Sequence, residues 1–343
     1  MYKILSIFLI ITVLNSCSND SLTITDTPLY TLPDINSTIL TDIPSDTNIE
    51  LTFQVLDWCR IIYKEELGYT PCSNLNIEAP IQGPLSGKTV IVDPGHGGRD
   101  NGAIANDVRE KDINRAVSNY LIEDLKEVGA NVIVTRKEDE SLYLYDRPTI
   151  ANLVVLIKSY LNTSNQDEKE SIANLILSLE QILADGENRV PYIYRKTDDM
   201  NEDLKMIFEL TNQIDDTVFV SIHSNVKGDS VVDLEGLDII LSGNSLNSLY
   251  PGYNFYNDED RELFGNLLGE NISKEVPINL RKAYFGDYAV LREENLPSSL
   301  IELGYMDDEE DLKLLTDKDT QKKYAQGITN AIIEYFNQKE KVS

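Results

Sequence analysis

The chain has 343 residues, of which 30 are basic and 58 are acidic, so its formal net charge is −28 at pH 7. A polyanion of this kind repels phosphate backbones, and we therefore expect no nucleic-acid partner. The length predicts about two domains. Three cysteines and two histidines exclude a disulfide-dense miniprotein and a metal site rich in Cys and His, but leave room for one small metal site.

The N-terminus predicts export. Residues 4–14 form an apolar run that is shorter than the about 20 apolar residues of a membrane-spanning helix and is typical of a signal peptide. The following Leu14-Asn15-Ser16-Cys17 resembles a bacterial lipobox, whose cysteine is lipidated and becomes the first residue. We expect a signal peptide at 1–16 and a tether at 17–26. Cys17 would anchor the protein to the outer face of the cell membrane, or to the outer membrane in a diderm; the alternative is an ordinary signal peptide.

Residues 27–75 read as short strands separated by turns, which predicts a small all-β domain. Trp58-Cys59-Arg60-Ile61 and Gly68-Tyr69-Thr70 resemble two strands of bacterial SH3 domains, which often recognise cell-wall peptides. The alternative is that these aromatic residues only fill a core. Cys59 and Cys72 would lie in an exported domain, where a disulfide and a pair of buried thiols both remain open.

A linker at 76–87, with two prolines and two glycines, separates this SH3-like barrel from a different pattern. Over 88–338, strand-like runs alternate with helical stretches, which predicts an α/β domain with a mainly parallel twisted sheet flanked by helices. The predicted last helix covers about Asp319 to Gln338. The expected strands are TVIVD, ANVIVTR, TVFVSIH, GLDIILS and SSLIELG.

Both histidines follow predicted strands. His96 lies in the glycine-rich loop after the run 89–92, and His223 ends the run 218–222. Sites in open α/β sheets gather at the carboxyl ends of strands, so this placement favours a shared metal site over core packing. Catalytic zinc has three such protein ligands and keeps a fourth position open for water.

An acidic side chain should complete this set. Glu110, 14 residues after His96 at the start of a predicted helix, is our candidate, because the glycines between them allow the chain to turn back. Position alone does not single it out among 58 acids, so three neighbouring aspartates remain alternatives: Asp93, Asp100 and Asp107.

Glu302 is the candidate proton carrier. It lies inside the otherwise apolar run 299–304. Apolar surroundings raise the pKa of a carboxyl group and a nearby zinc ion lowers it, so this residue is suited to accept a proton from water and pass it to a leaving amine. The alternative is a salt-bridged structural carboxylate.

Four motifs occur in a characteristic order: TVIVDPGHGGRDNGA, EKDIN, FVSIHSN and LIELGY. Together they resemble the zinc-dependent N-acetylmuramoyl-L-alanine amidases of the amidase type 3 family, over about residues 88–336. The resemblance implies that His96, Glu110 and His223 hold one Zn²⁺ per chain and that Glu302 is catalytic. It implies hydrolysis of the amide between N-acetylmuramic acid and L-alanine in peptidoglycan.

The chain departs from that family in a long helical segment, about 153–212, between the second and third strands of the domain. Some relatives carry an inserted helix whose glutamate plugs the zinc until a partner removes it. Glu170, Glu180 or Glu187 would be the plug here, with a regulator acting on the insertion. The alternative is a solvated helical hairpin that only packs on the sheet.

Two other functions remain to be weighed. A zinc peptidase that cuts within the stem peptide is disfavoured, because H-E-x-x-H is absent and the motifs stand in the amidase order. A non-catalytic wall-binding lipoprotein would require a lost ligand, and none is lost. The pattern does not distinguish vegetative wall from spore cortex as substrate, and it leaves the oligomeric state open.

Overall fold

A computed structural model describes residues 20–79, 81–186, 189–195, 199–228 and 234–342. The predicted signal peptide and Cys17 lie outside these residues, as does Glu187. No helix within these ranges is both long and apolar enough to cross a membrane. The chain forms two compact units, 1–79 with 156–186 and 80–155 with 187–343.

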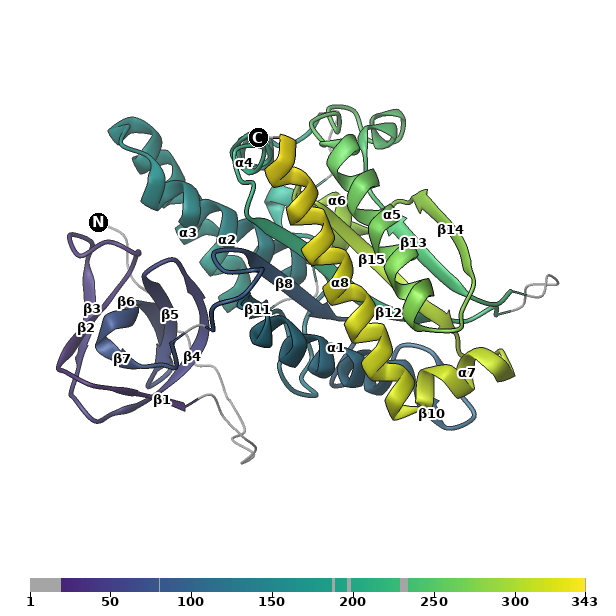
Figure 1. The fold of residues 1–343 in the computed structure, drawn as a ribbon. Helices are drawn as coiled ribbons and strands as arrows, with labels where there is room; N and C mark the ends of the chain where they lie inside the picture. Colours follow the sequence, from purple (N-terminus) through teal and green to yellow (C-terminus); the bar gives the residue numbers. More distant parts are fainter. Residues whose placement is uncertain (1–19, 80, 187–188, 196–198, 229–233, 343) are drawn as a thin grey trace. The chain divides into compact units, whose positions relative to one another are not determined.

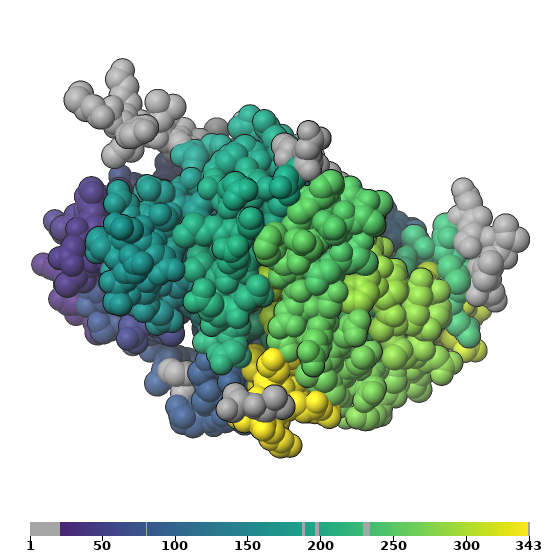
Figure 2. Space-filling model, turned by 90° about the horizontal axis from the view of Figure 1, so that it is seen from above, coloured from purple at the N-terminus to yellow at the C-terminus, as the bar shows by residue number. Residues whose placement is uncertain are grey.

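The first unit contains an antiparallel β domain, drawn in purple and blue in Figure 1 and Figure 2. Its strand order is β3-β2-β6-β5-β4-β1-β7, and a 3-10 turn (Cys72–Asn74) precedes the last strand. The strands begin earlier than expected, because part of the predicted tether pairs with β4 and β7 as strand β1. The bounds are β1 Asp20–Thr23, β2 Thr27–Tyr30, β3 Ile39–Ile43, β4 Asn48–Val55, β5 Trp58–Tyr63, β6 Glu66–Pro71 and β7 Leu75–Asn76.

Alternating apolar side chains form the core of this domain. Leu29, Ile43 and Ile61 are fully buried, and the Cys59–Cys72 disulfide lies among them. The open question of these two cysteines is thus answered by a disulfide. Tyr69 is also buried, whereas Trp58 is half-buried, with its ring edge-on to Tyr30.

Two helices complete the first unit. Helix α2 (Asp146–Asn162) crosses the division between the units, and α3 (Gln166–Asp185) follows after a short turn. The Asn165 side chain accepts hydrogen bonds from the first backbone amides of α3, and Gly186 ends the helix in the left-handed region. One face of α3 is buried through Ile172, Leu175, Ile176 and Leu179, so the predicted helical hairpin exists.

The second unit is built on a six-stranded sheet of order β11-β8-β12-β15-β13-β14. The first four strands are parallel; β13 runs antiparallel to β15, and β14 is parallel to β13. A mixed sheet with a parallel majority therefore confirms the predicted fold class. All five expected strands are present, and β14 was missed. The bounds are β8 Thr89–Pro94, β11 Asn131–Val134, β12 Thr217–Asn225, β13 Leu237–Leu241, β14 Leu280–Phe285 and β15 Ser298–Tyr305.

Helices α1, α5 and α8 cover one face of this sheet, with α8 crossing it in Figure 1. Their apolar stripes share a core with alternate strand residues, and the predicted stripe of Tyr324, Ile328, Ile332 and Phe336 on α8 is buried in it. The remaining elements are β9 Ile104–Ala105, β10 Val108–Arg109, α1 Glu110–Glu127, 3-10 turns Tyr192–Tyr194 and Asn244–Ser248, α4 Glu202–Thr211, α5 Asp258–Glu275, α6 Ala289–Arg292, α7 Glu309–Thr316 and α8 Lys318–Val342.

Candidate active site

Three parallel strands deliver the candidate residues to one edge of the sheet. His96 follows β8, His223 lies near the end of β12, and Glu302 lies on β15 in register with His223. Strand β12 pairs with both of the others, so the carboxyl ends of all three meet. Glu110 reaches the same edge as the first residue of α1.

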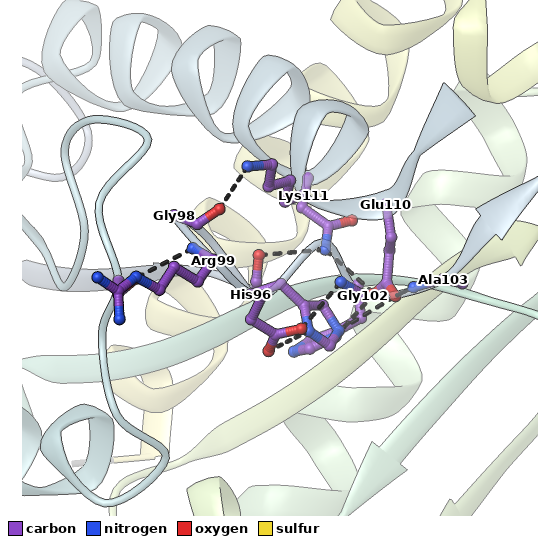
Figure 3. Close-up of polar contacts among 12 residues, drawn as sticks. His96, Gly98, Arg99, Gly102, Ala103, Glu110 and Lys111 are labelled. Atoms are coloured by element: carbon purple, nitrogen blue, oxygen red, sulfur yellow. Dashed lines mark hydrogen bonds and ion pairs between the residues drawn. The ribbon is translucent and has the colours of Figure 1, made fainter. Parts of the chain in front are cut away.

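His96, Glu110 and His223 come together there. Each offers one ligand atom, and these atoms lie within 4.8 Å of one another. The two carboxylate oxygens of Glu110 divide between the histidines: Oε2 lies 3.1 Å from His96 Nε2, and Oε1 lies 3.0 Å from His223 Nδ1. Figure 3 shows the end of the Glu110 side chain next to Gly102 and Ala103.

Glycines make this close approach feasible. A Cβ at Gly95 would lie 2.4 Å from the ring of His223, and a Cβ at Gly102 would lie 2.4 Å from Glu110 Oε2. Gly102 also has a positive φ of +63°, as does His96 at +59°, which is uncommon for a residue with a side chain. The glycine-rich loop therefore folds tightly enough to aim His96 at Glu110.

The carboxylate of Glu110 is held in its ionised form. It is 5% exposed and accepts hydrogen bonds from the backbone amides of Ala103 (2.9 Å) and Ser224 (3.1 Å) and from the side chain of Asn114 (3.2 Å). Burial raises the pKa of Glu110, but the two histidines outweigh burial and lower it far below its usual range. An ionised carboxylate beside two imidazoles is a donor set that zinc prefers.

Two further polar contacts fix the loop that carries His96. Asp100 Oδ2 lies 2.8 Å from His96 Nδ1. Burial lowers the pKa of His96, but Glu110 and then Asp100 outweigh burial and raise it. The Lys111 ammonium donates to the Gly98 carbonyl (2.6 Å) and to Asp139 (2.9 Å), as Figure 3 shows for Gly98.

A buried brace lies beneath the loop. Asp93 is fully buried and accepts hydrogen bonds from Thr135 (2.5 Å), Ser221 (2.7 Å) and Arg147. Arg147 also donates to the His96 carbonyl at 2.9 Å. Burial raises the pKa of Asp93, but the Arg147 guanidinium and the hydroxyl groups outweigh burial and lower it. The brace therefore ties β8 to the backbone of His96.

Glu302 has the opposite surroundings. It is 8% exposed, and its Oε2 has no hydrogen-bond partner within the described part of the chain. Burial is the main cause that raises its pKa to about 7, and the carboxylates of Glu110 and Asp238 add to that effect. An unpaired buried oxygen and a pKa near neutrality suit a group that binds and moves a proton.

These residues line a cleft of about 470 Å³. Its polar lining residues include His96, Glu110, His223 and Glu302. Its apolar and aromatic lining residues are Leu142, Leu144, Val226, Tyr288, Val290 and Leu300, with alanines. A mainly apolar cleft with a few convergent polar groups is the usual form of a small-substrate site.

The three aspartates considered as alternatives to Glu110 lie outside the triad. Asp93 belongs to the brace, Asp100 contacts the outer nitrogen of His96, and Asp107 is exposed in a tight turn. The sequence analysis missed the contributions of Asn114, Lys111 and Arg147. Asn114 and Lys111 stand in the EKDIN motif, whose spacing puts Asn114 one helical turn after Glu110.

The sequence left open whether the helical segment supplies a plugging glutamate or forms a hairpin that only packs on the sheet. Glu180 bonds to Arg60 and Tyr69 of the β domain, within the first unit. Glu170 is exposed on α3. Among the described residues that line the cleft, none comes from α3.

The fold and the site define an α/β domain with a candidate metal-ligand triad, and comparison with known families gives its class. The family model described as N-acetylmuramoyl-L-alanine amidase matches residues 90–155 and 159–334. The chain belongs to this family, the amidase type 3 family, and it is an N-acetylmuramoyl-L-alanine amidase.

Individual proteins are also similar to this chain. The chain is similar to the germination-specific N-acetylmuramoyl-L-alanine amidase of Bacillus subtilis (strain 168), 26% identical over 78% of this chain and 87% of that protein. It is similar to the probable cell wall amidase LytH of Staphylococcus saprophyticus, 23% identical over 98% of this chain and 91% of that protein. The N-acetylmuramoyl-L-alanine amidase crystal structure from Clostridium difficile 630 is 22% identical, covers 74% of this chain and 98% of its own, and has a TM-score of 0.49.

Proposed function

We propose that this enzyme is a zinc-dependent amidase that cleaves the bond between the lactyl group of N-acetylmuramic acid and the L-alanine of the stem peptide. His96, Glu110 and His223 are the proposed ligands of one Zn²⁺. The fit rests on two imidazoles and an ionised carboxylate within reach of one ion, next to the unpaired oxygen of Glu302. When bound, zinc supplies a Lewis acid that polarises the amide carbonyl and lowers the pKa of water.

Glu302 carries the proton in this proposal. Its carboxylate takes a proton from the attacking water as the water oxygen bonds to the lactyl carbonyl carbon. The same proton then passes to the alanine nitrogen as the carbon–nitrogen bond breaks, which leaves a lactyl carboxylic acid and an amine. The acid's remaining proton passes to the amine at neutral pH, so the products are a carboxylate and an ammonium group. The raised pKa of Glu302, about 7, allows both transfers near neutral pH. This single observation, an unpaired buried carboxylate beside the triad, carries the proposal.

Digestion of purified sacculi tests the reaction. We expect new L-alanine amino termini to appear with wild-type protein, to disappear after chelation and to return when Zn²⁺ is added back. Metal analysis should find one ion per chain, and the Glu110→Gln variant should lose it. New amino termini at another stem position, or undiminished cleavage in a metal-free sample, would overturn the proposal. Vegetative and cortex sacculi, assayed side by side, identify the preferred wall.

We also propose that the protein is exported and held by a lipid at Cys17, with the β domain acting as an SH3-like module near the wall. The apolar run before Cys17 and the strand pattern of residues 27–75 support this. Mass spectrometry of the mature N-terminus should find a diacylglyceryl group on Cys17. A free Cys17 thiol would reduce the anchor to an ordinary signal peptide.

The alternative function is a non-catalytic lipoprotein that binds the wall. It would need a missing ligand or a blocked cleft. The complete triad and the cleft above it disfavour this alternative. Sacculus binding without release of any amino terminus, by a protein with its full metal content, would favour it.

A further inference from the structure

Helix α3 and the β domain of the first unit meet through two polar contacts. At the first, Arg60 on β5 forms a bidentate pair with Glu180, with Nε 2.9 Å from Oε1 and Nη2 2.6 Å from Oε2. Tyr69 on β6 donates a further hydrogen bond to Glu180. The Arg60 and Glu180 side chains are only 8% and 13% exposed.

The second contact lies toward the other end of α3. The Lys169 ammonium lies 3.2 Å from Asp34, in the loop between β2 and β3. The hydroxyl of Tyr160, on α2, donates to the same carboxylate at 3.1 Å, and Lys169 lies 4.5 Å from the centre of the Tyr160 ring. Asp34 thus holds both helices of the hairpin.

The two contacts belong to one face of α3. Lys169 and Glu180 are 11 residues apart, which is about three helical turns, so they project in nearly the same direction. The buried residues Ile172, Ile176 and Leu179 lie along that side, whereas Glu170 and Leu177 are exposed on the other. The face therefore combines an apolar stripe with one charge at each end.

The charges also specify direction. The β domain offers an anion, Asp34, to the start of α3 and a cation, Arg60, to its end. Reversing the helix would bring Lys169 to Arg60 and Glu180 to Asp34, and both pairings repel. Complementary charges that make the wrong orientation unfavourable are typical of a specific interface.

We propose that α3 is the built-in ligand of the β domain, and that the helical insertion serves to dock this domain through Glu180 and Lys169. Glu180 then occupies a carboxylate-binding site formed by Arg60 and Tyr69. Another carboxylate ligand for that site would first have to displace α3. The helix is a docking element in this proposal, and it has no part in closing the metal centre.

Hydrogen exchange of the full chain tests the docking. In Glu180→Ala, removal of one partner leaves the buried Arg60 without its counter-charge, so we expect the α3 amides to exchange at least about tenfold faster. Amides of β8, β12 and β15 should be unchanged, as should amidase activity. The matched control is Glu170→Ala, on the exposed side of the same helix, which should behave as wild type. Equal exchange in the two variants would overturn the proposal.

Exchanging the charges of Asp34 and Lys169 at the second contact distinguishes loss of docking from misfolding. Asp34→Lys alone should speed exchange of α3, and Asp34→Lys combined with Lys169→Asp should restore slow exchange. Failure of this rescue would contradict direct pairing. A rise in amidase activity in Glu180→Ala, with α3 exchange unchanged, would instead support a plug. Chelation should not alter α3 exchange, so this test is independent of the proposed zinc chemistry.

Discussion

Two buried carboxylates near the candidate site, Asp93 and Glu302, have different surroundings. Asp93, at the end of β8, has both oxygens bonded, by a guanidinium and two hydroxyl groups. Glu302, on β15, has an oxygen without a partner and two other carboxylates nearby. The pKa of Asp93 is lowered, and the pKa of Glu302 is raised to about 7.

We interpret this difference as the one between a structural carboxylate and the proposed proton carrier. A fully bonded carboxylate keeps its charge and holds its neighbours in place, whereas an underbonded one exchanges its proton near neutral pH. Glu180 in the first unit resembles Asp93, because both of its oxygens are bonded. Burial alone therefore does not distinguish the proposed proton carrier from Asp93 and Glu180, whereas the hydrogen bonds that these carboxylates accept do.

The largest effect is expected at the underbonded site. Glu302→Gln should lower amidase activity by about 10²–10⁴-fold, because the amide cannot carry the proton. Zinc content should stay at the wild-type value, since the triad is untouched. Glu294→Gln is the control, because Glu294 is buried but paired with Arg261. Sacculus digestion and metal analysis on the three proteins check this, and equal losses of activity in both variants would contradict it.

The second largest effect is expected at the braced site. Asp93→Asn should cost about 3–5 kcal/mol of unfolding free energy, because it leaves the buried Arg147 without its counter-charge. The lowered pKa of Asp93 gives stability that is present above the unfolded value of 3.8 and is lost as pH falls through the folded value. Denaturant unfolding at pH 7 and pH 3 checks both points, and the gap between variant and wild type should shrink at pH 3.

Glu302→Gln should raise the free energy of unfolding at high pH, whereas Asp93→Asn lowers it. The raised pKa of Glu302 stabilises the fold below the unfolded value of 4.5, and this contribution is lost as pH rises through about 7. The difference between the two pKa values corresponds to roughly 3 kcal/mol. At pH 8, after chelation, the variant should therefore unfold at a higher denaturant concentration than wild type. A variant that unfolds earlier would show that Glu302 is paired in solution.

The contrast also explains what the sequence could predict. The sequence could predict His96, His223 and Glu302 as site residues. Apolar strand patterns show where strands end, and parallel strands end at one edge of the sheet. Glu110 required the resemblance, since many acids surround it. Strand β14 was missed because its sequence, LRKAYF, is charged and forms an edge.

The contacts that hold the site were not predictable. Those of Asp100 and Lys111 depend on a loop that turns through left-handed residues, which no periodicity reveals. The same holds away from the site, in the first unit, where the Arg60–Glu180 pair joins residues 120 positions apart and only the folded chain shows it. Local patterns therefore placed the reacting groups, and tertiary contacts supplied their supports.

Asp100 should show an intermediate effect, because it supports a proposed ligand from outside. Removing such a partner typically lowers metal affinity by about 10–100-fold. The Asp100 side chain is 68% exposed, so we expect Asp100→Asn to weaken zinc binding by only about tenfold. Competition with a chelator measures this. An effect as large as that of Glu110→Gln would make Asp100 a ligand itself.

The smallest effect is expected where a carboxylate is bonded but not buried. Asp112 lies 2.7 Å from Arg109, and both side chains are more than 40% exposed. Exposed ion pairs contribute about 0–1 kcal/mol, because water competes for both charges. Asp112→Asn should therefore change the unfolding free energy by less than about 1 kcal/mol. If Asp112→Asn lowered the unfolding free energy as much as Asp93→Asn, then charge alone would stabilise the brace, and burial and complete hydrogen bonding would not be needed.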